Sequence, residues 1–190
     1  MIIVKIREDM AVLQVIKTRR SIRSFKQEPV PDEDALQILD AARLAPSGGN
    51  RQRWKFVYVK ASHVVRMIKN CSPGIYGDAA AVIAICLEAE KEAFGRTEYS
   101  DVVGIMDVGF AAENILLAAK ALGLGGCAIA SFNASGVKKV LEIPDGWKPV
   151  LLVTLGYPDK EPRVPTKKTL SEVVYLNRFG EKWEGLEGRS

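Results

Sequence analysis

The chain has 190 residues, of which 47% are hydrophobic and 26% are charged, and its formal net charge at pH 7 is +4. This length and composition predict a single soluble domain, spanning residues 1–190, with a substantial core. The small excess of positive charge suits an anionic ligand, but it gives no reason to expect a nucleic-acid partner.

The first helix is expected over residues 10–18, where apolar side chains recur at helical spacing. It leads directly into Arg19-Arg20-Ser21-Ile22-Arg23, which places three arginines and a hydroxyl within five residues. Guanidinium groups can bind phosphate oxygens in a two-pronged fashion, so this cluster is a candidate anion site. The alternative is a solvated basic turn, because such short motifs are loose.

A second helix is expected over residues 32–44, with three acidic residues in its first turn, where they complement the helix dipole. It must end before Pro46. Residues 46–50 then form a loop of small side chains, which would let the backbone approach a flat ligand closely. The alternative is an ordinary connecting loop.

Four later runs of β-branched, aromatic or other apolar residues predict strands. They span residues 54–60, 79–87, 127–132 and 150–155. Two shorter helices are expected at residues 62–70 and 134–141, the second capped by Asn133. Helices mixed with buried strands indicate a central sheet that is covered on both faces.

The longest helix is expected between Asp101, as its N-cap, and Gly123, as its C′ residue. Its apolar residues cover nearly every direction of the helical wheel, which predicts a core helix buried on all sides. Polar residues interrupt it too often for a membrane span. Those residues are Asp107, Glu113, Asn114 and Lys120. Its small residues would also let it pack against its own copy in a dimer.

The C-terminal part, from about residue 157 to 190, is rich in proline and basic residues and has one short helical pattern at 171–176. A tail with so little core of its own must lie along another surface, such as a partner subunit. Residues 88–99 are charged and poorly periodic, which favours a mobile surface segment near the mouth of a site.

Several motifs that carry chemistry are absent or misplaced. Gly123-x-Gly125-x-x-Ala128 resembles a dinucleotide-binding fingerprint, but it follows a helix and enters a strand, the reverse of the required order. No HExxH or cysteine–histidine array offers metal ligands, and the single histidine, His63, is expected on the surface. Demanding chemistry should therefore come from a bound cofactor.

The three cysteines form no CxxC pair, and Cys86 and Cys127 stand in apolar surroundings. Buried free thiols are typical of a reducing compartment. The N-terminal apolar run is too short for a signal peptide, and no segment is expected to span a membrane. We therefore expect a cytoplasmic protein without a membrane partner.

Five stretches, in this order along the chain, resemble the nitroreductase family of FMN-dependent oxidoreductases. They are RRSIRSF at 19–25, APSGGNRQRW at 45–54, DVGFAAENILLAAKALGLGGCAIASF at 107–132, LVTLGYP at 152–158 and KKTLSEVV at 167–174. Two features depart from the family pattern. Arg53 stands where proline is usual, and lysine replaces a late arginine, which keeps the charge but loses the planar fork.

The resemblance implies an α+β fold with a central, mostly antiparallel sheet flanked by helices. It also implies a homodimer with the long helix at the interface and two FMN sites between the subunits. In the family the first motif holds the FMN phosphate and ribityl chain, and a late basic residue completes the phosphate site. These roles fall here on Arg19, Arg20, Ser21 and Arg23, and on Lys167 or Lys168.

The second motif of the family comes from the other subunit and lies against the flavin. It corresponds here to Pro46, Ser47, Gly48 and Asn50. Residues 128–131 would run beside the isoalloxazine ring, with backbone N–H groups near Ala130 and Ser131 reaching its N5 side.

The activity that the resemblance implies is hydride transfer from NADH or NADPH to flavin N5, and from there to a nitroaromatic, a quinone or a related small acceptor in a ping-pong cycle. No side chain need act as an acid or base. Two alternatives stay open. One is a specialised relative that dehalogenates an aromatic or fragments FMN itself, and the other is an FMN-binding carrier or sensor without turnover.

Overall fold

A four-stranded sheet in the order β1-β2-β4-β3 forms the centre of the protein in the computed structural model, which describes residues 12–89, 97–160 and 162–186. The strands are β1 (Trp54–Val59), β2 (Ala81–Glu88), β3 (Gly125–Ile129) and β4 (Trp147–Gly156). All three strand pairings are antiparallel. The fold is therefore α+β with an antiparallel sheet, as predicted.

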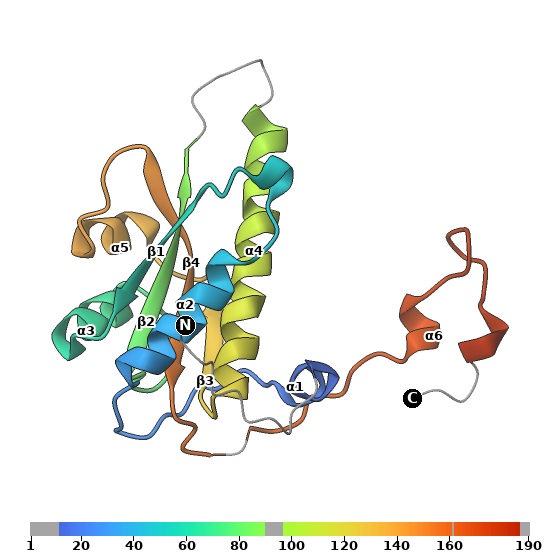
Figure 1. Ribbon diagram of the computed structural model, residues 1–190, viewed down its shortest axis with the longest axis horizontal. Helices are drawn as coiled ribbons and strands as arrows, with labels where there is room; N and C mark the ends of the chain where they lie inside the picture. Colours follow the sequence, from blue (N-terminus) through green and yellow to red (C-terminus); the bar gives the residue numbers. More distant parts are fainter. Residues whose placement is uncertain (1–11, 90–96, 161, 187–190) are drawn as a thin grey trace.

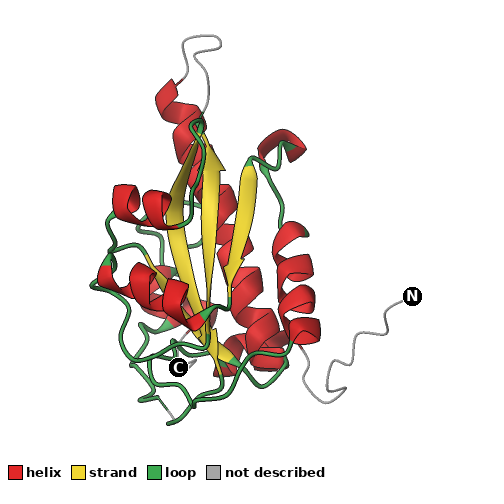
Figure 2. Ribbon diagram, turned by 90° about the vertical axis from the view of Figure 1, so that its left-hand side faces the viewer, coloured by secondary structure: helices red, strands yellow, loops and turns green. Residues whose placement is uncertain are grey.

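Helices cover both faces of this sheet (Figure 2). One face carries α2 (Asp32–Arg43) and α4 (Thr97–Ala121), and the other carries α3 (Ser62–Asn70) and α5 (Ala134–Val140). The remaining elements are short. They are α1 (Val12–Thr18), the 3-10 turn η1 (Gly48–Asn50), α6 (Leu170–Val173) and the 3-10 turn η2 (Glu184–Leu186).

Strand β2 joins the two halves of the core because its side chains point alternately to the two faces. Ile83, Ile85 and Leu87 pack on the α4 side, whereas Val82 and Ala84 pack on the side of α3 and α5. All five are buried. A strand covered on both faces needs apolar residues at every position, which explains the unbroken apolar run in the sequence.

Helix α4 begins at Thr97, one turn earlier than expected, so the prediction that Asp101 caps it is wrong. A cap contributes only about 1 kcal/mol, which further turns of helical hydrogen bonding can outweigh. The other end is as predicted. Gly123 has φ +80°, and the N–H groups of Gly123 and Leu124 donate to the carbonyls of Lys120 and Ala119, which closes the helix in a Schellman motif.

One side of α4 is not covered by the residues that the structure describes, which corrects the expectation of a helix buried all round. Val102, Ile105, Met106 and Phe110 each expose about half of their side-chain surface, between 46% and 56%. These residues recur at helical spacing and so form one apolar face. We call this set the exposed α4 face.

Residues Val102–Ala121 also meet the length and composition criteria of a membrane-spanning helix, so the expectation that no segment would do so is wrong. Its few charged residues are spread along a long apolar sequence, and the core helix of a soluble protein meets the same criteria. Here the helix packs on the sheet and on α2. A hydrogen bond from the Asn114 side chain to the carbonyl of Ala41 joins it to α2.

All four strands differ from their expected bounds by one to three residues, and β3 and β4 differ most. Strand β3 starts at Gly125 and ends at Ile129, and Gly126 pairs so closely with β4 that a Cβ there would clash with the Thr154 carbonyl. Strand β4 starts at Trp147, and the register shifts beside Pro149, which cannot donate to the ladder.

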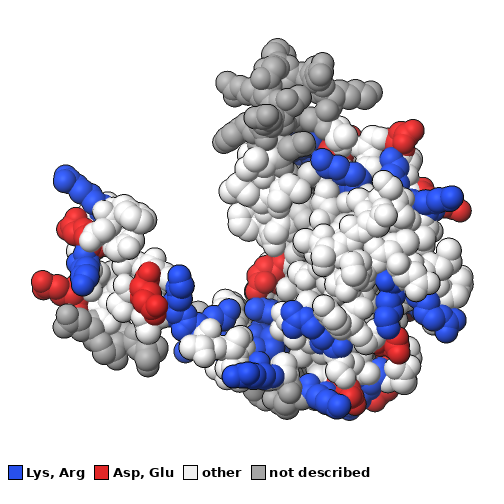
Figure 3. Space-filling model, turned by 180° about the vertical axis from the view of Figure 1, so that it is seen from behind, with Lys and Arg blue, Asp and Glu red and all other residues white. Residues whose placement is uncertain are grey.

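The tail from residue 162 to 186 extends away from the rest of the protein (Figures 1 and 3). Its short helix α6 carries a capping box, in which Thr169 and Glu172 bond each other's backbone N–H groups. Most of the tail is exposed. Of the expected mobile segment 88–99, residues 90–96 lie outside the described residues.

Candidate functional site

The RRSIRSF segment is held beside the sheet by its two apolar residues, Ile22 and Phe25, which are both buried. The Ile22 N–H donates to the Gly126 carbonyl at 2.9 Å, and Ser21 forms a parallel bridge to the same glycine. A Cβ on Gly125 would lie 2.3 Å from the Ile22 side chain, so glycine is needed for this approach. The segment is therefore a fixed part of the fold and not a solvated turn.

A cavity of about 500 Å³ opens beside this segment, between the end of α4, the start of β3 and the chain that follows β4. This volume lies within the usual range for ligand sites. Four of its lining residues are cations and one is an anion. They are Arg19, Arg20, Lys120 and Lys160, with Asp159. Backbone of Gly123 to Gly126 completes the wall, so the cavity suits an anionic ligand.

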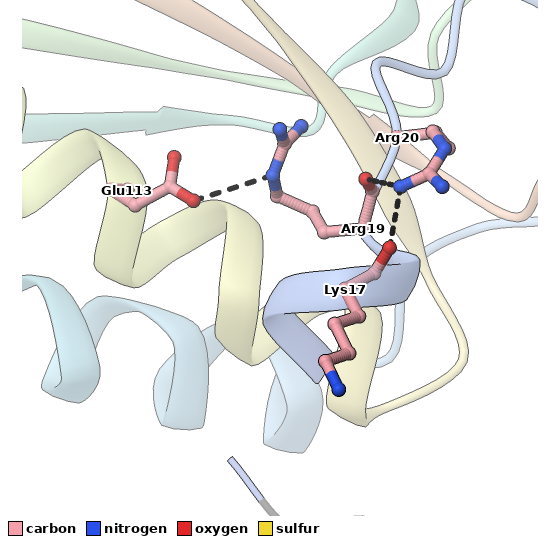
Figure 4. A network of polar contacts seen from close by, with 4 residues as sticks. All are labelled: Lys17, Arg19, Arg20 and Glu113. Atoms are coloured by element: carbon pink, nitrogen blue, oxygen red, sulfur yellow. Dashed lines mark hydrogen bonds and ion pairs between the residues drawn. The ribbon is translucent and has the colours of Figure 1, made fainter. Parts of the chain in front are cut away.

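The two arginines that line the cavity point in opposite directions (Figure 4). Arg19 forms an ion pair through Nε with the Glu113 carboxylate of α4, at 3.3 Å. Arg20 turns back so that Nη1 donates to the carbonyls of Lys17 and Arg19, at 2.8 and 2.7 Å. Its Nε is buried without a hydrogen-bond partner, although a guanidinium donor in such a position normally has one.

The other residues that were predicted to bind the phosphate and ribityl chain lie outside the lining of this cavity. Ser21 is half-buried on the adjoining backbone, whereas Arg23 is exposed. Lys167 and Lys168 are exposed on the tail, just before α6. A single chain thus brings Arg19 and Arg20 into one cavity and leaves the two lysines apart from it.

The second motif packs further toward the N-terminus of α4, between its start and its middle. Pro46 and Ser47 lead into η1, whose Gly48 N–H donates to the Asp107 carboxylate at 3.1 and 3.3 Å. Lys120, at the cavity, is thirteen residues further along the same helix, or about 20 Å at 1.5 Å per residue. The chain therefore does not bring Gly48 and Asn50 together with Arg19 and Arg20.

Ala130 and Ser131 follow β3 and are both exposed. The Ser131 carbonyl accepts a hydrogen bond from Gly74 at 3.3 Å, and a Cβ on Gly74 would lie 2.4 Å from the Ser131 hydroxyl. The loop before β2 thus fixes their position at the end of the edge strand.

Sequence reasoning missed two cations of the cavity, Lys120 and Lys160. In the sequence, Lys120 is one of the polar interruptions of an apolar helix, and Lys160 lies at the start of the C-terminal tail. The available signal for Lys120 was its place in the last turn of α4, where a cation complements the helix dipole. Nothing local in the sequence marks Lys160.

Other titratable groups give little sign of a separate reactive centre in the described residues. His63 is exposed, as expected, and these residues contain no cluster of metal-ligating side chains. The three cysteines are free, with Cys86 and Cys127 buried as predicted. Burial raises the pKa of the Cys86 thiol to about 11, which keeps it protonated and unreactive at neutral pH.

A family model for the nitroreductase family matches residues 16–74 and 68–157. The chain belongs to the nitroreductase family. It is 34% identical over 161 residues to a protein of Methanothermobacter thermautotrophicus whose name assigns it provisionally as an NADH dehydrogenase/NAD(P)H nitroreductase, with 80% of each chain covered.

Solved structures of this family share the fold. An FMN-dependent nitroreductase from Clostridium difficile superposes with a TM-score of 0.76 at 27% identity, covering 88% of this chain and 99% of its own. The NADPH:FMN oxidoreductase of Vibrio harveyi, solved in complex with NAD+, gives the same TM-score and identity, covering 90% of this chain and 78% of its own.

Proposed function

We propose that this nitroreductase-family chain is an FMN-dependent oxidoreductase that uses NADH or NADPH to reduce a small electron acceptor. The observation that carries the proposal is the cationic cavity at Arg19 and Arg20, which coincides with the motif that holds the FMN phosphate in the family. Its relatives include an NADPH-flavin oxidoreductase from Vibrio harveyi and an FMN reductase from Bacillus subtilis.

The residues of the cavity fit the anionic end of FMN. A phosphate would give the buried Nε of Arg20 the acceptor that the described residues do not provide. Arg19, Lys120 and Lys160 would supply further positive charge, and the backbone from Gly123 to Gly126 lies in the same wall. Ser21 and Arg23 would hold the ribityl chain, and Lys167 or Lys168 would complete the phosphate contacts.

Bound FMN supplies the redox chemistry, accepting hydride at N5 from the nicotinamide and passing reducing equivalents to a nitroaromatic, a quinone or a related acceptor in a second half-reaction. The protein's residues bind and orient. Cations and N–H groups near the flavin would stabilise negative charge that develops there. Ala130 and Ser131, which are both exposed, would present backbone N–H groups to the N5 side, and no side chain is assigned as an acid or base.

The active form is proposed to be a homodimer that pairs along α4. The exposed α4 face supports this, because an apolar stripe of four large side chains on one helix is typical of an interface. Within it, a Cβ placed on Gly109 would meet nothing within 4 Å, so a second helix can approach closely there. Pairing would bring the loop Pro46–Asn50 of one copy to the arginine cavity of the other.

The tail is proposed to pack on the partner subunit, so that residues 1–190 form one domain with a C-terminal arm from about residue 157. Exposed apolar side chains of the arm support this, including Leu170, Val173 and Phe179. We further propose a cytoplasmic enzyme without nucleic-acid or membrane partners.

The absorption spectrum of the purified protein is the first test. Flavin bands near 370 and 450 nm are absent from the protein itself, so they would report bound FMN directly. Anaerobic stopped-flow mixing with NADH and with NADPH is the second test, since an oxidoreductase must bleach the 450 nm band with at least one of them. A protein that binds FMN tightly but is bleached by neither would be a carrier or sensor.

A further inference from the structure

The loop Ser47–Gln52 has an unusual backbone that requires support from its surroundings. Gly49, Asn50 and Gln52 have φ angles of 61°, 54° and 49°, which lie in the left-handed region. Two of these three residues are not glycine, and a side chain makes that conformation unfavourable. Contacts from neighbouring elements must therefore fix the loop in this form.

Part of that support is internal. The Ser47 hydroxyl accepts from the Gln52 N–H at 3.1 Å, and the Ser47 carbonyl accepts from the Asn50 N–H at 2.9 Å. The Gln52 side chain also donates to the Asn50 side chain at 3.1 Å. These bonds define the shape of the loop but do not fix its position relative to α4.

The Asp107 carboxylate links the loop to α4. It is only 4% exposed, and both of its oxygens lie within hydrogen-bond distance of the Gly48 N–H. In the described residues this N–H is the one donor that the structure gives to it. A carboxylate buried in an apolar helix is unfavourable for stability, so its presence here suggests a task other than packing.

Contact between the loop and α4 is also close in the steric sense. A Cβ added to Gly48 would lie 2.6 Å from Cγ1 of Val103, one helical turn before Asp107. Glycine at this position lets the Gly48 N–H reach the carboxylate, and any larger residue would push the loop off the helix. The contact therefore needs both residues, because Asp107 provides the acceptor and Gly48 has no side chain to prevent the approach.

We propose that Asp107 is a positioning residue for the flavin site: its buried carboxylate holds the Gly48 N–H and so sets the loop Ser47–Gln52 where it meets the flavin bound by the partner copy. This inference rests on the proposed function. Asp107 acts through the loop and does not itself touch the cofactor. The loop's left-handed backbone is kept in place for a ligand that a single chain does not bind alone.

The test compares FMN binding by the wild-type protein and two variants, Asp107→Asn and Asn114→Ala. Asp107→Asn has nearly the same shape but removes the charge, and we expect the Kd for FMN to rise about tenfold, because a hydrogen bond to a charged group is replaced by a neutral one. Visible circular dichroism of the bound flavin should change as well, since the loop lies against the ring.

Asn114→Ala is the matched control on the same helix. It removes the Asn114 bond to the Ala41 carbonyl, 2.9 Å long, which ties α4 to α2 away from the loop. We expect this variant to lose thermal stability while its Kd for FMN stays within about twofold of wild type. Equal effects of Asp107→Asn and Asn114→Ala on FMN binding would overturn the positioning role.

A second pair of substitutions displaces the loop by steric clash and leaves the Asp107 charge unchanged. Gly48→Ala should weaken FMN binding by displacing the loop, and adding Val103→Ala should restore part of the affinity by making room for the new methyl group. If the wild type binds no FMN, the proposed function fails. If the wild type binds FMN, and Asp107→Asn and Gly48→Ala bind it with the wild-type Kd and the wild-type flavin circular dichroism, only the positioning role fails.

Discussion

The C-terminal end of α4 and its middle lie beside two different groups of the predicted site residues. At the C-terminal end, Arg19, Arg20, Lys120 and Lys160 surround a cavity whose charge suits an anion. Near the middle of the helix, a loop with left-handed backbone is bonded to Asp107. The first region offers a cavity with an excess of positive charge, and the second offers a loop of defined backbone shape. The proposed pairing of two copies would bring the two regions together.

Disrupting the exposed α4 face should have the largest effect, because it would separate the two regions. Gly109→Arg places a long cation where a Cβ meets nothing within the chain, so the monomer should fold normally. We expect light scattering to show a monomer and the Kd for FMN to rise more than about a hundredfold. The control is Ser135→Arg, on the exposed side of α5, which should remain dimeric.

A dimeric Gly109→Arg protein with wild-type FMN affinity would contradict the proposed pairing along α4. A monomeric protein with wild-type affinity would instead show that a single chain completes the site.

Removing the Arg20 guanidinium should have the next largest effect, mainly on binding of the phosphate. We expect Arg20→Ala to raise the Kd for FMN roughly thirtyfold, as the loss of charge-assisted hydrogen bonds predicts. Binding of riboflavin, which has no phosphate, should change less than about twofold. Isothermal titration with both ligands measures this, and equal weakening of the two would place Arg20 elsewhere on the flavin.

Truncating Lys120 or Lys160 should change the Kd for FMN by a smaller factor, and that factor should depend on the salt concentration. Lys120→Ala and Lys160→Ala should each raise the Kd for FMN about threefold at low salt, and the difference from wild type should shrink near 0.5 M NaCl because exposed charges are screened. Lys139→Ala, an exposed position on α5, is the matched control. An effect that persists unchanged at high salt would argue against an electrostatic role.

The smallest effect is expected from Cys86, and only at alkaline pH. Burial raises the pKa of its thiol from 9.0 to about 11, so the unfolded chain loses the proton first as the pH rises. The stability that the thiol contributes is therefore complete below about pH 9 and is lost as the pH rises through 11, by at most about 3 kcal/mol. Between pH 7 and pH 11, the melting temperature should fall more steeply for the wild type than for Cys86→Ala.

Features governed by local chemistry could be predicted from the sequence. Asn133 caps α5 by accepting from the Gly136 N–H at 2.9 Å, and Gly123 ends α4 with a positive φ. The bounds of α2 and α3 agree closely with expectation, because their apolar spacing and flanking residues are contained within each segment. The predicted cluster of arginines is held in place by Ile22 and Phe25, two buried residues of the same segment.

Features that depend on distant segments could not be predicted. Lys160 belongs to the cavity only because the chain after β4 returns beside Arg20. Gly125 joins a strand, against its weak β preference, because no side chain fits beside Ile22. The bond between Asp107 and Gly48 joins residues that are 59 positions apart. No local pattern specifies such pairs.

The capping box in α6 has a consequence for how the arm would meet its surface. Thr169 and Glu172 close this turn through their own side chains, so local hydrogen bonds support its conformation. A turn that is already formed has less conformational entropy to lose on docking than an unstructured peptide of the same length. The arm is thus partly preorganised, which favours tight association from a short contact.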